Sequence, residues 1–207
     1  MRPRFVVWGF ILLKFLSIAV LWCTSCLRTH YLQEETEIEA RYFKPGEYQG
    51  FEDQIEAFQR EVFPENDSSW YLDYISNGHC IFLLKGRKKD IIGLAHLRPR
   101  PSAVAEGWKI FPELCGYIGS FGIVESEQGK GYGRELLSLI IEYAQAEFGV
   151  RRVELEVRAN NPQAYNLYLT HGFTGAILNR QYYSPRPKES FLQDFRIDGI
   201  HMEYLIE

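Results

Sequence analysis

A glycine-rich run near the middle of the chain joins a predicted strand to a predicted helix. Its sequence is Gln128-Gly-Lys-Gly-Tyr-Gly133. Glycines allow positive φ angles and close approach of the backbone to a ligand. The amino end of a helix adds unpaired N–H groups and the positive end of the helix dipole. The run therefore predicts a phosphate or pyrophosphate site, although an ordinary glycine-rich turn between a strand and a helix would have a similar composition.

Two common nucleotide-binding patterns do not fit this run. The P-loop pattern G-x-x-x-x-G-K-[ST] is absent from the sequence. The dinucleotide pattern G-x-G-x-x-G fails because Arg134 stands where the third glycine is needed.

A second segment with chemical potential begins at Asn161. Asn161 and Pro162 suit a helix N-cap followed by proline at the first helical position. Gly172 suits the residue that follows the end of that helix. Asn161, Ala164 and Tyr168 then lie close to one face of the helix. Tyr168 could donate a proton, although most tyrosines only pack.

The strand before this helix carries acidic residues at alternate positions. In Val153-Glu-Leu-Glu-Val-Arg158, the apolar side chains face one side, and Glu154, Glu156 and Arg158 face the other. A carboxylate such as Glu156 could accept a proton from a substrate. The alternative interpretation is an exposed carboxylate on the surface of a sheet.

Together, the two segments resemble the GNAT superfamily of acetyltransferases. Gln128-x-x-Gly131-x-Gly133 is similar to its coenzyme A signature, [QR]-x-x-G-x-[GA]. Asn161 to Phe173 is similar to its N-x-x-A-x-x-L-Y-x-x-x-G-F segment. The motifs occur in the family's order and at its spacing, and the likeness covers roughly residues 36–206.

The resemblance implies acetyl-CoA as co-substrate, without a metal. It implies that the strand before the glycine-rich run offers its backbone to the pantetheine arm. The expected donor-binding residues are Phe121, Gly122, Ile123, Gln128, Gly129, Lys130, Gly131, Tyr132, Gly133, Arg134, Asn161 and Ala164.

Three shorter segments resemble the RimI-type protein N-terminal acetyltransferases. These are Leu155-Glu-Val-Arg-Ala-Asn-Asn161, Arg180-Gln-Tyr-Tyr183 and Asp198-Gly-Ile-His-Met202. The resemblance implies that Glu156 is the general base and Tyr168 the general acid. It also implies that Tyr182 and Tyr183 contact a peptide.

The expected acceptor is therefore the α-amino group of a protein or peptide. One alternative is a small amine, such as a polyamine, an amino acid or an aminoglycoside. Another is a non-catalytic module that binds acyl-CoA, which would need neither Glu156 nor Tyr168.

Hydrophobic periodicity predicts the elements that position these residues. Helices are expected at about 51–62, 69–76, 131–148 and 162–170, with a Pro-rich loop at 99–112. The expected fold is α/β, the GNAT fold, with a mixed, mostly antiparallel sheet flanked by helices. Strands are expected at about 36–43, 79–85, 90–98, 114–124, 151–158, 173–183 and 197–206.

Bulk composition excludes several classes of protein. The chain has 207 residues, of which 46% are hydrophobic, so it can build a packed core. The net charge is −4 and no long basic run occurs, which argues against nucleic-acid binding. Four cysteines without suitable spacing predict neither a metal site nor a disulfide framework.

The first residues permit three interpretations. Phe5 to Leu27 is mostly apolar and long enough for a membrane span, with Lys14 near its centre costing about 3 kcal/mol. Arg2 and Arg4 would hold the amino terminus in the cytosol and place the rest outside, away from acetyl-CoA. The segment is a membrane anchor, a targeting peptide or an over-extended reading frame.

We expect residues 1–33 to form a hydrophobic N-terminal segment that includes a helix. We expect residues 34–207 to form the acetyltransferase domain. A cytoplasmic location is expected, with membrane association through residues 5–27 as the alternative. The sequence predicts no oligomeric state.

Overall fold

The computed structural model describes residues 37–102, 113–184 and 196–206. The chain divides into two units, and the larger, residues 39–84 and 90–207, carries every predicted site residue. The hydrophobic segment at 5–27 and the boundary expected after residue 33 lie outside the described residues.

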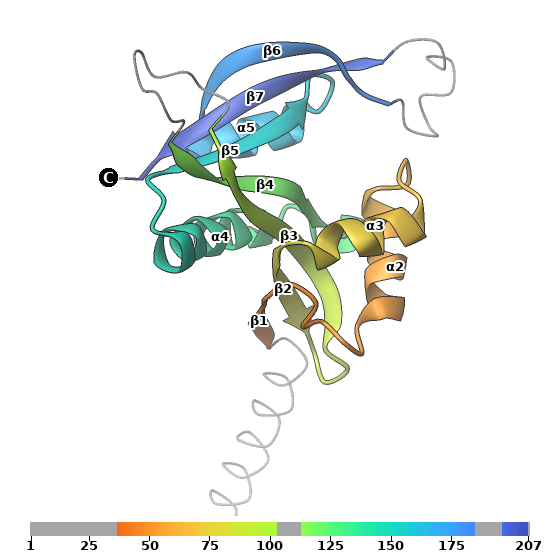
Figure 1. Cartoon of the computed structure of the whole chain (residues 1–207). Coiled ribbons are helices and arrows are strands. Elements are labelled where there is room, and N and C mark those ends of the chain that lie inside the picture. The colour runs from red at the N-terminus through yellow and green to blue at the C-terminus, as the bar shows by residue number, and fades with distance from the viewer. Residues whose placement is uncertain (1–36, 103–112, 185–195, 207) are drawn as a thin grey trace, which may run out of the picture. The chain divides into compact units, whose positions relative to one another are not determined.

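Strands and helices follow one another in nearly the predicted order (Figure 1). The elements are β1 (Ile38–Phe43), α2 (Glu52–Val62), α3 (Ser68–Ser76), β2 (His79–Lys85), β3 (Asp90–Pro101), β4 (Leu114–Ile123), the 3₁₀ helix η1 (Glu125–Glu127), α4 (Tyr132–Phe148), β5 (Arg152–Arg158), α5 (Pro162–His171), β6 (Thr174–Tyr183) and β7 (Ile197–Leu205).

The described strands form one sheet in the order β1-β2-β3-β4-β5-β7-β6. β4 and β5 are parallel, whereas β3 with β4, β5 with β7 and β6 with β7 are antiparallel. This arrangement confirms the predicted α/β fold with a mixed, mostly antiparallel sheet.

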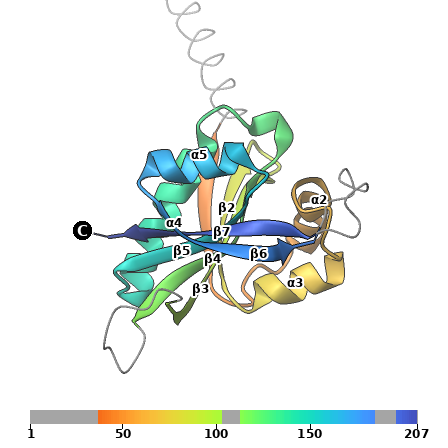
Figure 2. The same ribbon diagram turned by 90° about the horizontal axis from the view of Figure 1, so that it is seen from above.

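Helices lie on both faces of the sheet (Figure 2). The ring of His96 on β3 lies against Tyr74 of α3, with 4.7 Å between the ring centroids. The next residue, Leu97, points to the opposite face, where a Cβ at Gly116 would touch both Leu97 and Ala144 of α4. α2 and α3 therefore pack on one face, and α4 packs on the other together with α5.

Helix α4 has the amphipathic pattern that the sequence predicts. Gly131 precedes it with φ of 92°, and Gly149 ends it with φ of 63°. Both angles favour glycine, because other residues rarely adopt positive φ. One stripe of the helix is buried against the sheet, and it consists of Leu136, Leu137, Ile140, Ile141 and Ala144.

The Pro-rich stretch begins differently from the prediction. Residues 99–101 belong to β3 rather than to a loop. Pro99 and Pro101 alternate, so their nitrogens, which lack a hydrogen, face the same side of the strand, and Arg100 between them pairs with Cys115 of β4. Proline is tolerated in a strand where its nitrogen points away from the hydrogen-bonded ladder. Residues 103–112 lie outside the described residues.

The register between β3 and β4 shifts at one point. Leu97 pairs with Ile118, but His96 pairs with Ser120, so Gly119 is an extra residue on β4. Such a β-bulge bends the strand and increases its twist.

The parallel pairing of β4 with β5 stops beside this bulge. It includes Gly116, Tyr117 and Ile118 of β4 and ends at the pair Ile118–Leu155. Beyond it, β4 continues to Ile123 and β5 to Arg158 without pairing to each other. The two strands therefore separate, and the sheet opens at its centre.

We predict that Gly119→Ala destabilises the protein by about 1–3 kcal/mol, because a Cβ at this position would overlap the Tyr74 hydroxyl. Tyr74→Phe removes that hydroxyl, so the double variant Gly119→Ala/Tyr74→Phe should recover part of the loss. Urea unfolding of the four proteins measures the coupling. A Gly119→Ala variant as stable as the original would show that the bulge does not need glycine.

Candidate active site

A cleft of about 700 Å³ opens where β4 separates from β5. Its walls come from the end of α2, the end of β4, the glycine-rich loop, the start of α4 and helix α5. Most of the predicted donor-site residues, together with Tyr168, line it: Phe121, Gly122, Ile123, Gln128, Gly129, Gly131, Gly133, Arg134, Asn161, Ala164 and Tyr168.

The glycine-rich loop has the geometry of an anion site. Gly129 and Gly131 have φ angles of 76° and 92°, and a Cβ on either would point into open space. No side chain caps the amino end of α4 at this loop. The N–H groups and the positive dipole of the helix are therefore directed at the cleft, beside the cationic Arg134.

Gln128 holds the walls of this cleft together. Its Nε2 donates a hydrogen bond to the Ile123 carbonyl at 3.0 Å. Its Oε1 accepts one from Gln163 Nε2 of α5 at 3.2 Å. The first residue of the predicted coenzyme A signature thus links the loop to the end of β4 and to α5.

Two predicted donor-site residues do not line the cleft. Lys130 Nζ forms an ion pair with Glu127 at 3.1 Å. Tyr132 is the first residue of α4 and is partly buried.

Helix α5 positions Tyr168 at the cleft. Asn161 Oδ1 accepts a hydrogen bond from Ala164 N at 3.1 Å, so Asn161 is the predicted N-cap. The Tyr168 ring lies between Phe121 of β4 and Phe173, with centroid distances of 5.8 and 5.7 Å. Burial raises the pKa of the Tyr168 hydroxyl, which therefore stays protonated at neutral pH.

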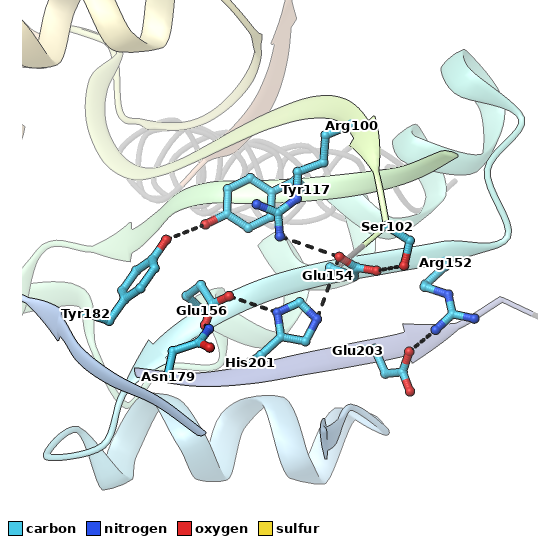
Figure 3. Close-up of polar contacts among 10 residues, drawn as sticks. All are labelled: Arg100, Ser102, Tyr117, Arg152, Glu154, Glu156, Asn179, Tyr182, His201 and Glu203. Carbon is cyan, nitrogen blue, oxygen red and sulfur yellow. Dashed lines mark hydrogen bonds and ion pairs between the residues drawn. The ribbon is translucent and has the colours of Figure 1, made fainter. Parts of the chain in front are cut away.

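Glu156 lies one residue beyond the last pair between β4 and β5. Its Oε1 is 2.9 Å from His201 Nδ1, and its Oε2 accepts a hydrogen bond from Asn179 Nδ2 at 3.1 Å (Figure 3). Only 6% of the side chain is exposed, so the alternative of an exposed strand carboxylate is wrong. Glu156 stands at the point where the sheet opens, although it does not itself line the 700 Å³ cleft.

Tyr182 and Tyr183 lie at the end of β6 near Glu156. The Tyr183 hydroxyl donates to the Glu156 carbonyl at 2.7 Å. Burial is the largest cause that raises the pKa of Tyr183, and the nearby groups Tyr182, Glu156 and Tyr168 raise it further. Tyr183 therefore lies close to both candidate catalytic groups. Tyr182 is 42% exposed, and its hydroxyl is 3.5 Å from that of Tyr117 (Figure 3).

Arg158 connects this region to the segment between α2 and α3. It is two residues from Glu156 and shares its face of β5. Its Nη2 lies 2.9 Å from Glu65 Oε1, and its guanidinium lies over the Tyr183 ring at 4.7 Å. The face that carries Glu156 is therefore the one covered by α2 and α3.

Several residues of the site had no sequence signal of their own. Glu61, Val62 and Phe63 line the cleft because α2 packs against β4, where a Cβ at Gly122 would collide with Val62. Gln163 and Leu167 also line the cleft. Both lie inside the matched motif, Gln163 at a position where any residue is allowed and Leu167 at its leucine position. His201 reaches Glu156 only through the pairing of β5 with β7.

Among the residues that the structure describes, no group of three or more His, Cys, Asp or Glu side chains is arranged to hold a metal ion. Within the same residues, no helix has the length and apolar character needed to cross a membrane.

The chain belongs to the GNAT acetyltransferase family. Its residues 36–173 match the model described as the Acetyltransferase (GNAT) family. This match confirms the predicted family and, at the level of the family, the predicted class of acetyl-CoA-dependent N-acetyltransferase.

Several curated relatives are named as acetyltransferases. YycN of Bacillus subtilis, an uncharacterized N-acetyltransferase, is 32% identical over 95 residues, which is 46% of this chain and 55% of YycN. An N-alpha-acetyltransferase of Sulfurisphaera tokodaii is 27% identical over 135 residues, covering 64% of this chain and 80% of that protein. The N-alpha-acetyltransferase RimI of Mycobacterium tuberculosis is 39% identical over 66 residues, or 32% and 39% of the two chains. The match therefore spans only about half of YycN and less than half of that RimI.

A solved structure supports the fold. The ribosomal-protein-S18-alanine N-acetyltransferase of Escherichia coli superposes with a TM-score of 0.62 at 20% identity, covering 83% of this chain and 95% of that chain. At this identity, the similarity shows a shared fold.

We predict that Gly131→Glu weakens acetyl-CoA binding by about tenfold or more, because a carboxylate would repel the pyrophosphate. Gly46→Glu is a matched control, since Gly46 also has positive φ, 77°, and an open Cβ direction but lies outside the cleft. Calorimetry on both folded variants separates the effect of charge in the cleft from backbone strain. Equal acetyl-CoA affinities of the two variants would show that the loop is not part of the donor site.

Proposed function

We propose that this protein transfers the acetyl group of acetyl-CoA to the α-amino group of a protein or peptide, in the cytoplasm. The observation that carries the proposal is the opening between β4 and β5. The glycine-rich cleft, which Tyr168 also lines, lies at this opening, and Glu156 lies at the point where the two strands separate.

We infer one orientation for the donor in the cleft. The pyrophosphate would lie on the loop from Gly129 to Gly133, where the amino end of α4 favours anions. The pantetheine arm would run along Phe121, Gly122 and Ile123, whose edge of β4 is not paired to β5. The thioester would then approach Tyr168.

Acid–base chemistry follows from the two candidate groups. Glu156 takes one proton from the acceptor ammonium, and the free amine attacks the thioester carbon. The tetrahedral intermediate expels the thiolate, which receives a proton from Tyr168. The amide nitrogen returns its surplus proton to Tyr168, and Glu156 releases the first proton to solvent. The products are the acetylated amine, coenzyme A and one proton.

The surroundings of Glu156 support a cationic acceptor. Glu154 and Glu156 are neighbouring carboxylates on one face of β5, and both are buried. Tyr182 and Tyr183 lie at the same end of the sheet, where the aromatic rings would contact a peptide. Relatives named N-alpha-acetyltransferase support a protein or peptide amino terminus as the acceptor.

We predict that the full chain acetylates short peptides with free α-amino groups, including an alanine-initiated hexapeptide, when it is supplied with acetyl-CoA. Mass spectrometry locates the acetyl group, and spermidine, free amino acids and an aminoglycoside form the parallel arm. Transfer to small amines with no transfer to peptides would overturn the proposed acceptor and leave the reaction class intact.

We predict that Tyr168→Phe lowers kcat by about 10²- to 10⁴-fold with little change in acetyl-CoA affinity, because it removes the proton donor and keeps the ring. Glu156→Gln should be impaired most near neutral pH and recover at high pH, where the acceptor is already a free amine. Stopped-flow or coupled assays over pH measure both. A fully active Tyr168→Phe would show that Tyr168 only packs. Equal impairment of Glu156→Gln at every pH would show that Glu156 orients the acceptor and does not act as a base.

A further inference from the structure

An imidazole lies between two buried carboxylates at the centre of the sheet (Figure 3). His201 of β7 is 2.9 Å from Glu156 through Nδ1 and 3.6 Å from Glu154 through Nε2. The exposed side-chain fractions are 1% for His201, 0% for Glu154 and 6% for Glu156. The antiparallel register of β5 and β7, with Glu156 opposite His201, creates this contact.

Glu154 is fixed from its other side. It accepts a hydrogen bond from the Ser102 hydroxyl and lies 3.5 Å from Arg100 Nη2. The Arg100 guanidinium is itself stacked on the Tyr117 ring at 3.4 Å. Glu154 therefore has little freedom to turn away from the imidazole.

The physical effect on Glu156 follows from burial. A carboxylate removed from water must be hydrogen-bonded, or it keeps its proton and cannot act as a base. A second carboxylate nearby makes ionisation harder still. An N–H donated from His201 Nδ1 counters both effects.

We propose that His201 is the positioning residue that supplies the hydrogen bond needed by the buried Glu156 carboxylate and aims that carboxylate at the acceptor amine. This inference rests on the proposed function of Glu156 as the base. His201 remains a hydrogen-bond donor before and after Glu156 takes the substrate proton, so it neither gains nor loses a proton in the cycle.

Other charged and titratable groups also face this cluster. β5 adds Arg152 and Arg158, and β7 adds Glu203, which pairs with Arg152. β3 contributes Arg100, β4 contributes Cys115 and Tyr117, and β6 contributes Tyr182 and Tyr183. Among these groups, His201 is the one whose N–H position lies against a Glu156 oxygen.

Two isosteric variants test the inference in the full chain. His201→Asn places an amide where Nδ1 stood and keeps a donor for Glu156, whereas His201→Gln places the amide near Nε2 and removes that donor. With the alanine-initiated hexapeptide as acceptor, we expect the acidic limb of the kcat–pH profile to move up by about one pH unit or more in His201→Gln. It should move much less in His201→Asn.

The matched control is His79→Asn. His79 is also a hydrogen-bonded strand histidine, 2.8 Å from the Tyr143 hydroxyl, and lies outside the site. Its variant should keep the original pH profile. Equal loss of kcat at every pH in both His201 variants would reduce His201 to a packing role and overturn the inference. The proposed function would still stand if Glu156→Gln shows its pH-dependent defect.

A second measurement needs neither an acceptor nor a variant. Nitrogen-15 NMR of the imidazoles in the full chain reports which ring nitrogen of His201 carries a proton. The inference expects a protonated Nδ1 at neutral pH, and a bare Nδ1 would overturn it whether or not a peptide is acetylated.

Discussion

The separation of β4 from β5 is the constraint on which the rest of the site depends. Parallel pairing holds the strands together as far as Ile118 and Leu155, and the extra residue Gly119 lies directly after it. Two strands cannot diverge inside a sheet without leaving backbone groups unpaired. The cleft lies at this opening, where the edge of β4 beyond Ile118 is not paired to β5 and could form hydrogen bonds with a ligand.

Burial of charge is the second consequence of this architecture. Glu154, Glu156 and His201 lie in the centre of a sheet that helices cover on both faces, and each of their side chains is at least nine-tenths buried. Ion pairs in such places rarely add stability, but loss of one partner typically costs about 3–5 kcal/mol. The stability of the fold therefore does not by itself account for this cluster.

Local features of the sequence predicted local features of the structure. The apolar stripe of α4 and the cap at Asn161 depend on residues close in sequence, and both agree with the structure. Most residues of the coenzyme A signature also line one cleft, because a strand–loop–helix junction places them together within one contiguous segment.

Long-range pairing accounts for what the sequence did not reveal. The burial of Glu156 requires β7 and β6 to supply His201 and Asn179, and a single strand pattern carries no trace of them. The bulge at Gly119 is likewise visible only against β3. The loop expected at 99–112 is wrong for residues 99–101, because a proline fits a strand when its nitrogen faces away from the ladder, and the local sequence does not show which side that is.

The most direct test of the account is a crystal structure of the protein with a bisubstrate analogue, in which coenzyme A is joined to the amino nitrogen of a peptide. The account predicts the pyrophosphate at Gly129–Gly133, the sulfur beside Tyr168 and the peptide nitrogen hydrogen-bonded to Glu156 directly or through one water. A peptide nitrogen on the face of the sheet away from Glu156, with no such path to Glu156, would contradict the account.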